Sequence, residues 1–452
     1  MAGLNRSGVP IAGDGRNLID GRGWGPDTPG MGLLPVLWIY GPPGVGKSTV
    51  AWELFAQHPG PVGYVDIDQL GMCYGAPTAE EWSPEPADDP GRYLRKERNL
   101  AAIVDNFHRA GARGLIVSGI VDSVRGIDFD LFRHVALKPL RLRCEPAELV
   151  RRLGERNRAG DRLDEIADYA EQMDRGDLPG DCIDSTGLDK TKTVDAVRDH
   201  LRDWPPDSGT DGAANGAANG AAVTVPGEIV WLCGPAAVGK STAGWETYMQ
   251  SRLAGAHTAF LDLQQIGFLR PEPADDHRLK AANLAAIWRT YYEAGARRLV
   301  VVGSVEHPDQ VALYRAALPG ATVTVCHLRA GLRRLTERTL LRGQGQGPPI
   351  AGDTLAGRPP AELRRRAAAA HARDQAVAGE PAPDTEARDH APGRDRGVPS
   401  AGRRPACTRT AVGDLEIDTD GQTPADTAAE ILKRISAPPP GTGPRSPGAR
   451  AT

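Results

Sequence analysis

The stretch that decides the fold is Gly41-Pro42-Pro43-Gly44-Val45-Gly46-Lys47-Ser48-Thr49, and a second stretch, Gly234-Pro235-Ala236-Ala237-Val238-Gly239-Lys240-Ser241-Thr242, repeats it. Both fit the pattern G-x-x-x-x-G-K-[ST] of a phosphate-binding loop. Each follows a short apolar run, at 36–40 and 229–233, and precedes a stretch that is compatible with a helix. This is the strand–loop–helix setting that the pattern requires. A glycine-rich turn without a ligand is the alternative, but two matches in the same setting argue against it.

The residue types in these loops suit a nucleotide. The backbone must wrap around an anion, so glycine and small residues are needed. The loop N–H groups and the N-terminus of the next helix would hold the β-phosphate. The loop lysines would reach the β- and γ-phosphates, and the serines after them would ligate Mg²⁺. The predicted nucleotide-binding residues are Gly41, Gly44, Val45, Gly46, Lys47, Ser48 and Thr49 in the first loop and Gly234, Val238, Gly239, Lys240, Ser241 and Thr242 in the second.

Composition narrows the class of protein. The chain has 452 residues, of which 40% are hydrophobic. We find no apolar run of the ~18 residues that a membrane helix needs, and no apolar segment of a secretory signal near the N-terminus. The six cysteines form no C-x-x-C pair, as expected of reduced thiols in a cytoplasmic protein. A net charge of −4 and a pI near 6.2 argue against a nucleic-acid partner.

The similarity between the two parts of the chain extends well past the loops. Pro-Glu-Pro-Ala-Asp-Asp at 84–89 recurs identically at 271–276, and Asn-Leu-Ala-Ala-Ile at 99–103 recurs at 283–287. Lys47 and Lys240 lie 193 residues apart, which is far longer than the period of about 20–50 residues in solenoid repeats. We therefore expect two whole domains in tandem.

The repeat and the biased segments predict the domain boundaries. Glycine, alanine and asparagine dominate the segment between the copies, so we expect a flexible linker, and hence copies that fold alone and move as loosely tethered bodies. The expected parts are a disordered tail at 1–30, a first domain at 31–202, the linker at 203–225, a second domain at 226–436 and a disordered tail at 437–452. Within the second domain, 342–411 reads as a low-complexity insertion that is mostly disordered, with a helix-favouring stretch at 361–378.

Strand and helix patterns alternate in the first copy. We expect strands near 36–40, 62–67, 114–119, 137–143 and 181–184, and helices near 47–57, 93–110, 146–158 and 190–202. Such alternation indicates a mainly parallel sheet with helices on both faces. The predicted fold is α/β, with two tandem P-loop NTPase domains that are each a three-layer αβα sandwich. The ligand is expected at the carboxyl ends of the strands.

Two carboxylates end the second strand of the first copy. Asp66 and Asp68 lie two positions apart, so they point to the same side of a strand. One could hold Mg²⁺, and the other could accept a proton from a hydroxyl or bind the substrate. The alternative is a pair of exposed turn acids. Because Asp66 recurs as Asp262, we favour the functional interpretation, although Gln264 replaces the second aspartate and cannot act as a base.

Other charged residues are candidates for the same site. Asp122 and Glu306 follow the third strand of each copy, and each is either a group that polarises metal-bound water or a solvated loop acid. Arg156 and Arg158 precede a charged loop, so we expect them to close as a lid on the transferred phosphoryl group. We expect the remaining arginines of these helices to form a solvated face, namely Arg151, Arg152, Arg333, Arg334, Arg338 and Arg342.

Together these motifs resemble those of the P-loop small-molecule kinases, a group that includes gluconate, shikimate and adenylylsulfate kinases and the chloramphenicol phosphotransferase-like proteins. The loops, the Asp-x-Asp, the arginine-rich helix and the strand ends at 183–188 and 417–421 carry the resemblance. It implies that the first aspartate serves Mg²⁺ and the second contacts the acceptor. These roles fall to Asp66 and Asp68 in the first copy, and the metal role to Asp262 in the second.

The sequence thus predicts a cytoplasmic ATP- and Mg²⁺-binding phosphotransferase that acts on a small hydroxyl acceptor. Lys47 would bind the β- and γ-phosphates, Ser48 and Asp66 would hold Mg²⁺, and Asp68 would act as the base or as an acceptor ligand. Ser241 and Asp262 would hold Mg²⁺ in the second copy, where the missing aspartate puts transfer in doubt. Two alternatives stay open: a nucleotide-binding regulatory ATPase without kinase activity, and a nucleic-acid end kinase. The acceptor is not revealed.

Overall fold

The computed structural model describes residues 33–77, 89, 91–155, 163–202, 204–205, 224–346, 351–378 and 412–436. By their contacts, the described residues from Leu34 onward group as one compact unit. Several predicted features lie outside the described residues: the two disordered tails, nearly all of the linker, the segment 379–411, and both Arg156 and Arg158.

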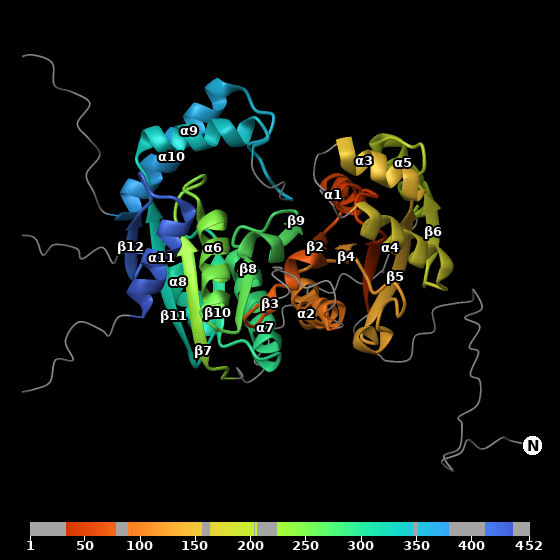
Figure 1. Ribbon diagram of the computed structural model, residues 1–452, viewed down its shortest axis with the longest axis horizontal. Helices are drawn as coiled ribbons and strands as arrows, with labels where there is room; N and C mark the ends of the chain where they lie inside the picture. Colours follow the sequence, from red (N-terminus) through yellow and green to blue (C-terminus); the bar gives the residue numbers. More distant parts are fainter. Residues whose placement is uncertain are drawn as a thin grey trace, which may run out of the picture. The chain divides into compact units, whose positions relative to one another are not determined.

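The first half of the unit, up to residue 205, begins with the strand and loop that the sequence predicts. Its elements are β1 (Leu34–Tyr40), α1 (Lys47–Gln57), β2 (Val62–Asp66), β3 (Cys73–Tyr74), α2 (Arg92–Arg109), β4 (Gly114–Gly119), β5 (Val135–Arg143), α3 (Pro146–Glu155), α4 (Leu163–Arg175), β6 (Asp181–Asp184) and α5 (Lys190–His200). Every predicted strand and helix of this half is present, with ends that differ by up to two residues, and the predicted helix end at 158 lies outside the described residues (Figure 1).

The second half, residues 224–436, follows the same order with one further helix. Its elements are β7 (Gly227–Cys233), α6 (Lys240–Leu253), β8 (Thr258–Asp262), β9 (Phe268–Arg270), α7 (His277–Glu293), β10 (Arg298–Val302), α8 (Pro308–Ala317), β11 (Ala321–Arg329), α9 (Leu332–Gly343), α10 (Pro360–Ala378), β12 (Leu415–Asp418) and α11 (Pro424–Ile435). The predicted helix at 361–378 is therefore confirmed as α10.

The two halves contain sheets of the same topology. The strand orders are β6-β5-β1-β4-β2-β9 and β12-β11-β7-β10-β8-β3, and only the last strand of each sheet is antiparallel. In register, Val36 of β1 pairs with Leu115 of β4 and with Leu137 of β5. In both sheets the loop strand, β1 or β7, is central, so the phosphate-binding loop leaves the middle of a parallel sheet.

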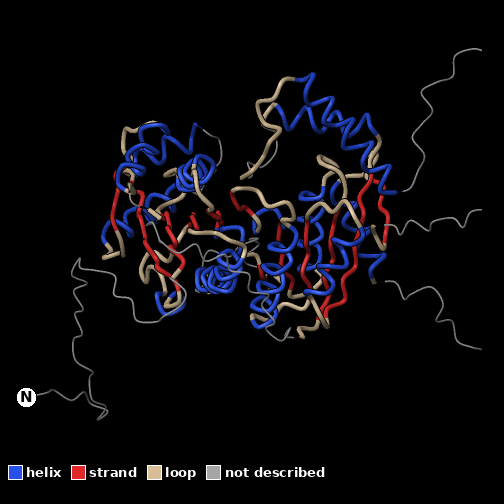
Figure 2. Tube along the Cα trace, turned by 180° about the vertical axis from the view of Figure 1, so that it is seen from behind, coloured by secondary structure: helices blue, strands red, loops and turns tan. Residues whose placement is uncertain are grey.

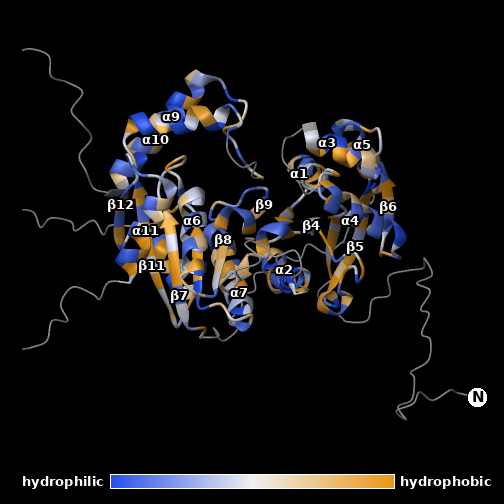
Figure 3. Cartoon of the chain, viewed as in Figure 1, coloured by the Kyte–Doolittle hydropathy of each residue, from blue (hydrophilic) through white to orange (hydrophobic). Residues whose placement is uncertain are grey.

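Alternate residues of the central strands enter different cores. In β1, Trp38 packs with Phe107 of α2, whereas Leu37 and Ile39 pack in the cluster that includes Phe55 of α1. The same alternation in β7 sends Trp231 towards α7 and Leu232 towards α6. Helices thus cover both faces of each sheet, as expected for three αβα layers, and they flank the strands in Figure 2. Much of β7 is apolar along its length (orange in Figure 3), as a strand that is buried on both faces should be.

The halves exchange short edge strands. Residues 268–270 form β9, which pairs with β2 of the first sheet. Cys73 and Tyr74 form β3, which pairs with β8 of the second sheet. Side chains move with these strands: Phe268 packs against Trp52, Phe55 and Tyr64 of the first half. We call these two segments, 71–75 and 267–270, the exchanged arms.

Helices α2 and α7 form a second contact between the halves. The side-chain amide of Asn106 donates to Asn283 Oδ1 over 2.8 Å, and Thr290 Oγ1 donates to Asn99 Oδ1. Because Asn99 corresponds to Asn283 and Asn106 to Thr290, each pair repeats the other with the halves reversed, which is the signature of a two-fold-related interface. The expectation of loosely tethered bodies is therefore wrong: a shared core and exchanged strands join the halves.

Sequence reasoning missed β3, β9 and α4. The arms have only two and three residues in strand conformation, and they gain their hydrogen bonds from sheet edges about 185 and 205 residues away in the chain. Local periodicity carries no signal for such pairing. Among the described residues, no helix is both long and apolar enough to span a membrane.

Candidate functional site

The first loop has the backbone geometry that its glycines predict. Gly46 has φ 106° and forms the N-cap of α1, a conformation that favours glycine. A Cβ at Gly41 would lie 2.2 Å from the carbonyl oxygen of Leu142, so no other residue fits there. The buried Lys47 Nζ donates to the carbonyl of Pro42 over 3.0 Å, and burial lowers its pKa. The lysine is thus held back against its own loop, within reach of an anion bound there.

The predicted metal-binding residues of the first half lie together. Ser48 Oγ donates to Asp66 Oδ2 over 3.0 Å, across the gap between α1 and β2. Asp66 Oδ1 accepts from the backbone N–H of Asp68 over 3.1 Å. Burial and the neighbouring Asp68 raise the pKa of Asp66 to about 7. A hydroxyl and one carboxylate fit Mg²⁺, which usually takes its other ligands from water and substrate phosphates.

Asp68 is fixed by a lysine that sequence reasoning missed. Lys96 Nζ of α2 lies 3.2 Å from Asp68 Oδ1, and its side chain is only 1% exposed. The backbone N–H of Ile120 also donates to this oxygen, over 3.4 Å. A signal existed in the sequence, because Lys96 recurs as Lys280 and Gly71 recurs as Gly267. A Cβ on Gly71 would lie 2.5 Å from Lys96 Cε, so the glycine makes room for the lysine.

The other charged candidates of the first half differ in whether they match their expected roles. Asp122 Oδ1 accepts from the backbone N–H groups of Val124 and Arg125, so it closes a turn, as a loop acid does. Arg151 pairs with Glu148 on an exposed helix face, as expected. Arg152 does not fit that expectation, because it donates to the carbonyls of Ser185 and Leu188.

The second loop repeats the first with one strained position. Gly239 has φ 107° at the N-cap of α6. Ala237, which replaces the glycine of the first loop, has φ 64°, in a region that favours glycine. Lys240 Nζ donates to the carbonyls of Gly234 and Pro235 over 2.9 and 2.8 Å, and burial lowers its pKa to about 8. The substitution therefore preserves the loop conformation.

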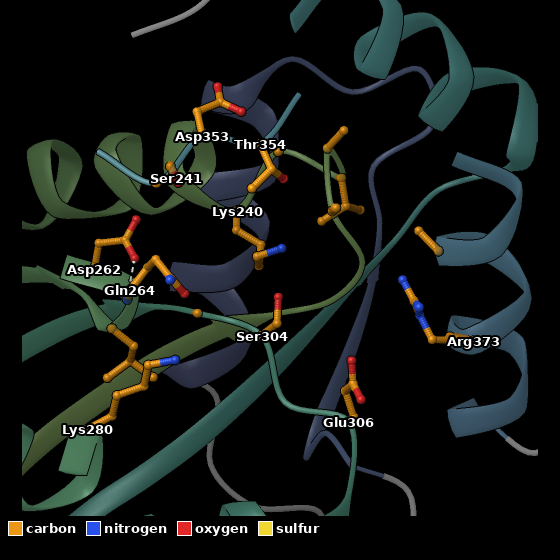
Figure 4. Close-up of a pocket in the computed structure, with 18 of the residues that line it drawn as sticks. Lys240, Ser241, Asp262, Gln264, Lys280, Ser304, Glu306, Asp353, Thr354 and Arg373 are labelled. Carbon is orange, nitrogen blue, oxygen red and sulfur yellow. Dashed lines mark hydrogen bonds between the residues drawn. The ribbon is translucent and has the colours of Figure 1, made fainter. Parts of the chain in front are cut away.

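A cavity of about 1450 Å³ opens over the second loop. Its walls come from the loop, the ends of β8 and β10, the start of α7, and the helices α9 and α10 (Figure 4). The loop lysine and serine, the β8 carboxylate, Gln264, Ser304 and Glu306 all line it, together with the α10 side chain Arg373. Among the described residues, no group of three or more acidic, histidine or cysteine side chains could hold a metal by itself.

The carboxylates of the second half are arranged differently. Asp262 accepts from the backbone N–H of Gln264 over 2.9 Å, just as Asp66 accepts from Asp68, and burial raises its pKa. Lys280 has no aspartate at position 264, and it pairs instead with Asp276, four residues earlier on the chain. Glu306 lines the cavity, whereas its counterpart Asp122 closes a turn.

Two arginines of α9 were expected on a solvated face, and this expectation is wrong. Arg338 Nη1 donates to the carbonyl of Val238 in the loop and to Thr419 Oγ1, the latter over 3.1 Å. Arg342 Nε donates to Asp353 Oδ2 over 2.8 Å. Both line the cavity. The spacing of arginines along a helix does not show which face the next helix, α10, will enclose.

Comparisons with known proteins agree with part of this description. A family model described as "AAA domain" matches residues 38–174, which is less than half of the chain. A search of curated proteins found no match.

Solved structures similar to this chain include the Deinococcus radiodurans tunicamycin resistance protein, at 18% identity and a TM-score of 0.27, covering 47% of this chain and 99% of that one. The Mycobacterium tuberculosis APS kinase CysC, in complex with AMPPNP and APS, is similar at 17% identity and a TM-score of 0.25, covering 47% and 100%. A gluconokinase from Sinorhizobium meliloti 1021 is similar at 21% identity and a TM-score of 0.21, covering 34% and 98%.

Proposed function

We propose that this chain is a tandem P-loop phosphotransferase whose first half binds Mg·ATP and transfers the γ-phosphoryl group to a small hydroxyl acceptor. One observation carries the proposal: Lys47, Ser48, Asp66 and Asp68 converge at the carboxyl ends of β1 and β2. Phosphoryl transfer depends mainly on positioning and on charge stabilisation, and these four side chains supply both.

Each of the four side chains has a distinct role. Lys47 would exchange its bond to the loop carbonyl for one to the β- and γ-phosphates. Ser48 and Asp66 would hold Mg²⁺, which would neutralise the phosphate charge when bound. Asp68, oriented by Lys96, would accept the hydroxyl proton or bind the acceptor. Arg156 and Arg158 remain candidates for the lid.

The geometry of the second half supports nucleotide binding more directly than phosphoryl transfer. Its loop geometry and its lysine match those of the first half. Gln264 cannot accept a proton, so the role of general base has no equivalent at that position. We propose that this half binds a nucleotide at Lys240, Ser241 and Asp262.

A regulatory nucleotide-binding protein is the second candidate function, and the exchanged arms favour it. Because β9 of the second half completes the first sheet beside β2, a change at the second site has a direct structural route to Asp66. A nucleic-acid end kinase has no comparable observation in its favour.

Titration of the full chain with Mg·ATP tests the proposal. We expect two bound nucleotides in the wild type and one in either Lys47→Ala or Lys240→Ala. A panel of hydroxyl metabolites then tests transfer: ATP-dependent phosphorylation should persist in Lys240→Ala and be lost in Lys47→Ala. Binding without transfer to any acceptor would favour the regulatory candidate. The absence of any heat of nucleotide binding would refute both.

A further inference from the structure

Helices α4 and α10 occupy corresponding places in the two halves. Asp174, near the end of α4, pairs with Arg141 and Arg143 of β5; its oxygen lies 3.0 Å from the second arginine. Asp374, near the end of α10, lies 2.8 Å from His327 and 3.7 Å from Arg329 of β11. Each helix is therefore anchored by an aspartate to the outer part of its sheet, and this anchor aligns position 174 with position 374.

With this alignment, the face of α10 that lines the cavity can be compared with α4. Its lining residues are Arg366, Ala369, Ala370 and Arg373, whose spacing places them on one side of a helix. The corresponding residues of α4 are Ile166, Tyr169, Ala170 and Met173.

The α4 residues belong largely to a packed interior. Met173 is 1% exposed and lies in the core, where Tyr169 packs against it. The hydroxyl of Tyr169 donates to the carbonyl of Val121. At positions where the first half has packed apolar and aromatic side chains, the second half has two guanidinium groups that line the cavity.

The two guanidinium groups differ in how they are paired. Arg366 lies 2.9 Å from Glu362 on its own helix. Arg373 is exposed and has no hydrogen-bond or ion-pair partner within the part of the chain that the structure describes. Its guanidinium points from α10 into the cavity, on the side where Ser304 and Glu306 lie (Figure 4).

Three of the seven acidic residues that line this cavity have ion-pair partners among the described residues, whereas Asp262, Glu272, Glu306 and Asp309 have none. Asp275 pairs with Arg278, Asp276 with Lys280, and Asp353 with Arg342. Of the acids labelled in Figure 4, Glu306 lies on the side towards which Arg373 points, and no ion pair joins the two among the described residues. Arg373 is therefore a cation available to a ligand, at a distance from the phosphate-binding loop.

We propose that the second half binds a small anionic hydroxyl compound, a carboxylate or a phosphate ester, through Arg373. The planar guanidinium suits either group because it can form two parallel hydrogen bonds. The corresponding positions of the first half, Tyr169 and Met173, carry no cation, so the first half has no equivalent of this anion-binding group. This inference rests on the proposed binding of a nucleotide by the second half.

Calorimetric titration of the full chain tests the inference. The protein is first saturated with Mg²⁺ and the non-hydrolysable β,γ-imido analogue of ATP, so that both phosphate-binding loops are filled. D-Glycerate, glycerol 3-phosphate and neutral glycerol are then added separately. We expect at least one anion to bind more tightly than glycerol, and the stronger of the two identifies the anionic group.

Variants assign this binding to its residue. Arg373→Met, which introduces the residue of the first half, should weaken anion binding about tenfold or more, since a hydrogen bond to a charged group is lost. Arg364→Met is the matched control, because Arg364 is exposed on α10 and does not line the cavity; it should bind like the wild type. Glu306→Gln should bind anions more tightly, since a like charge is removed.

Three results would overturn the inference: anions bind no better than glycerol, Arg364→Met is as damaging as Arg373→Met, or Arg373→Met weakens the ATP analogue instead of the anion. If the analogue itself fails to bind, the proposed function fails together with the inference, and the first titration shows this separately.

Discussion

Each half of this protein has its own sheet of the same topology, its own phosphate-binding loop, and a buried lysine on α2 or α7. These two helix lysines differ in their ion-pair partners. In the first half Lys96 pairs with Asp68, just after β2. In the second half Gln264 stands at that position, and Lys280 pairs with Asp276, the N-cap residue of α7. A buried ammonium group needs a counter-charge. The comparison shows that the same fold accommodates either ion pair, with or without an aspartate after the second strand.

The largest expected effect tests the assignment of the two halves to different chemistry. Asp68→Asn should lower transfer activity by ~10²–10⁴, since that is the usual contribution of a general base. Gln264→Ala should change it little. Steady-state kinetics on the full chain measure both variants. If the Gln264 variant proved as damaging as the Asp68 variant, the roles given to the halves would be wrong.

A core substitution tests whether the halves are joined as the structure shows. Phe268→Ala should reduce the free energy of unfolding by about 3–5 kcal/mol, the usual range for a buried phenylalanine. The reason is that its ring packs among Trp52, Phe55 and Tyr64 of the other half. Chemical denaturation monitored by tryptophan fluorescence measures the change.

The counterpart of Phe268 supplies the control for this experiment. Met72 of the other arm packs against the second-half core. Met72→Ala should destabilise the protein as well, by about 2–5 kcal/mol. Independent halves would instead leave the first-half transition unchanged in Phe268→Ala, and that result would contradict the exchange of arms.

A smaller effect is expected at the polar contact between α2 and α7. Asn283→Ala should cost about 1–3 kcal/mol of stability, because Asn106 and the carbonyl of Ile266 each lose a hydrogen-bond partner. Asn99→Ala is the matched variant from the other half and should have a similar cost. A difference of several kcal/mol between the two would show that the interface lacks its two-fold character.

The smallest expected effect is a pH dependence that the two halves should share. The pKa of Asp66 is raised to about 7, so the folded protein holds this proton more tightly than the unfolded chain does. Without Mg·nucleotide, its contribution to stability therefore decreases as the pH rises from about 4 to about 7.

Replacing this carboxylate should reveal the dependence. Asp66→Asn should melt about 2–4 °C higher than the wild type at pH 8 and show no gain at pH 4, by differential scanning calorimetry. Asp262→Asn should behave alike, since burial also raises the pKa of Asp262. With Mg·ATP present, the order should reverse at pH 8, because the metal requires the ionised carboxylate. A wild type that stays more stable than Asp66→Asn at pH 8 without nucleotide would contradict the assigned cause.

The sequence by itself determined the local parts of this protein. The glycine pattern predicts loops with positive φ at Gly46 and Gly239, because only glycine adopts that conformation without strain. Strand periodicity placed Asp66 at the end of β2, where Ser48 meets it. These features depend on residues close in the chain or on a recurrent strand–loop–helix unit. The prediction that Asp68 follows on the same strand is wrong, because Asp68 lies in a 3-10 helix at Ile67–Leu70 that Asp66 caps.

Only the tertiary structure decided the rest. The arms 71–75 and 267–270 gain their hydrogen bonds from the opposite half, so no local pattern reveals them. Arg338 and Arg373 line a cavity because α9 and α10 pack over the second loop. The sequence of an arginine-rich helix is the same whether its cations face water or a ligand. Contacts between residues distant in the chain determine which face of each helix is enclosed. The local sequence pattern of a helix does not contain this information.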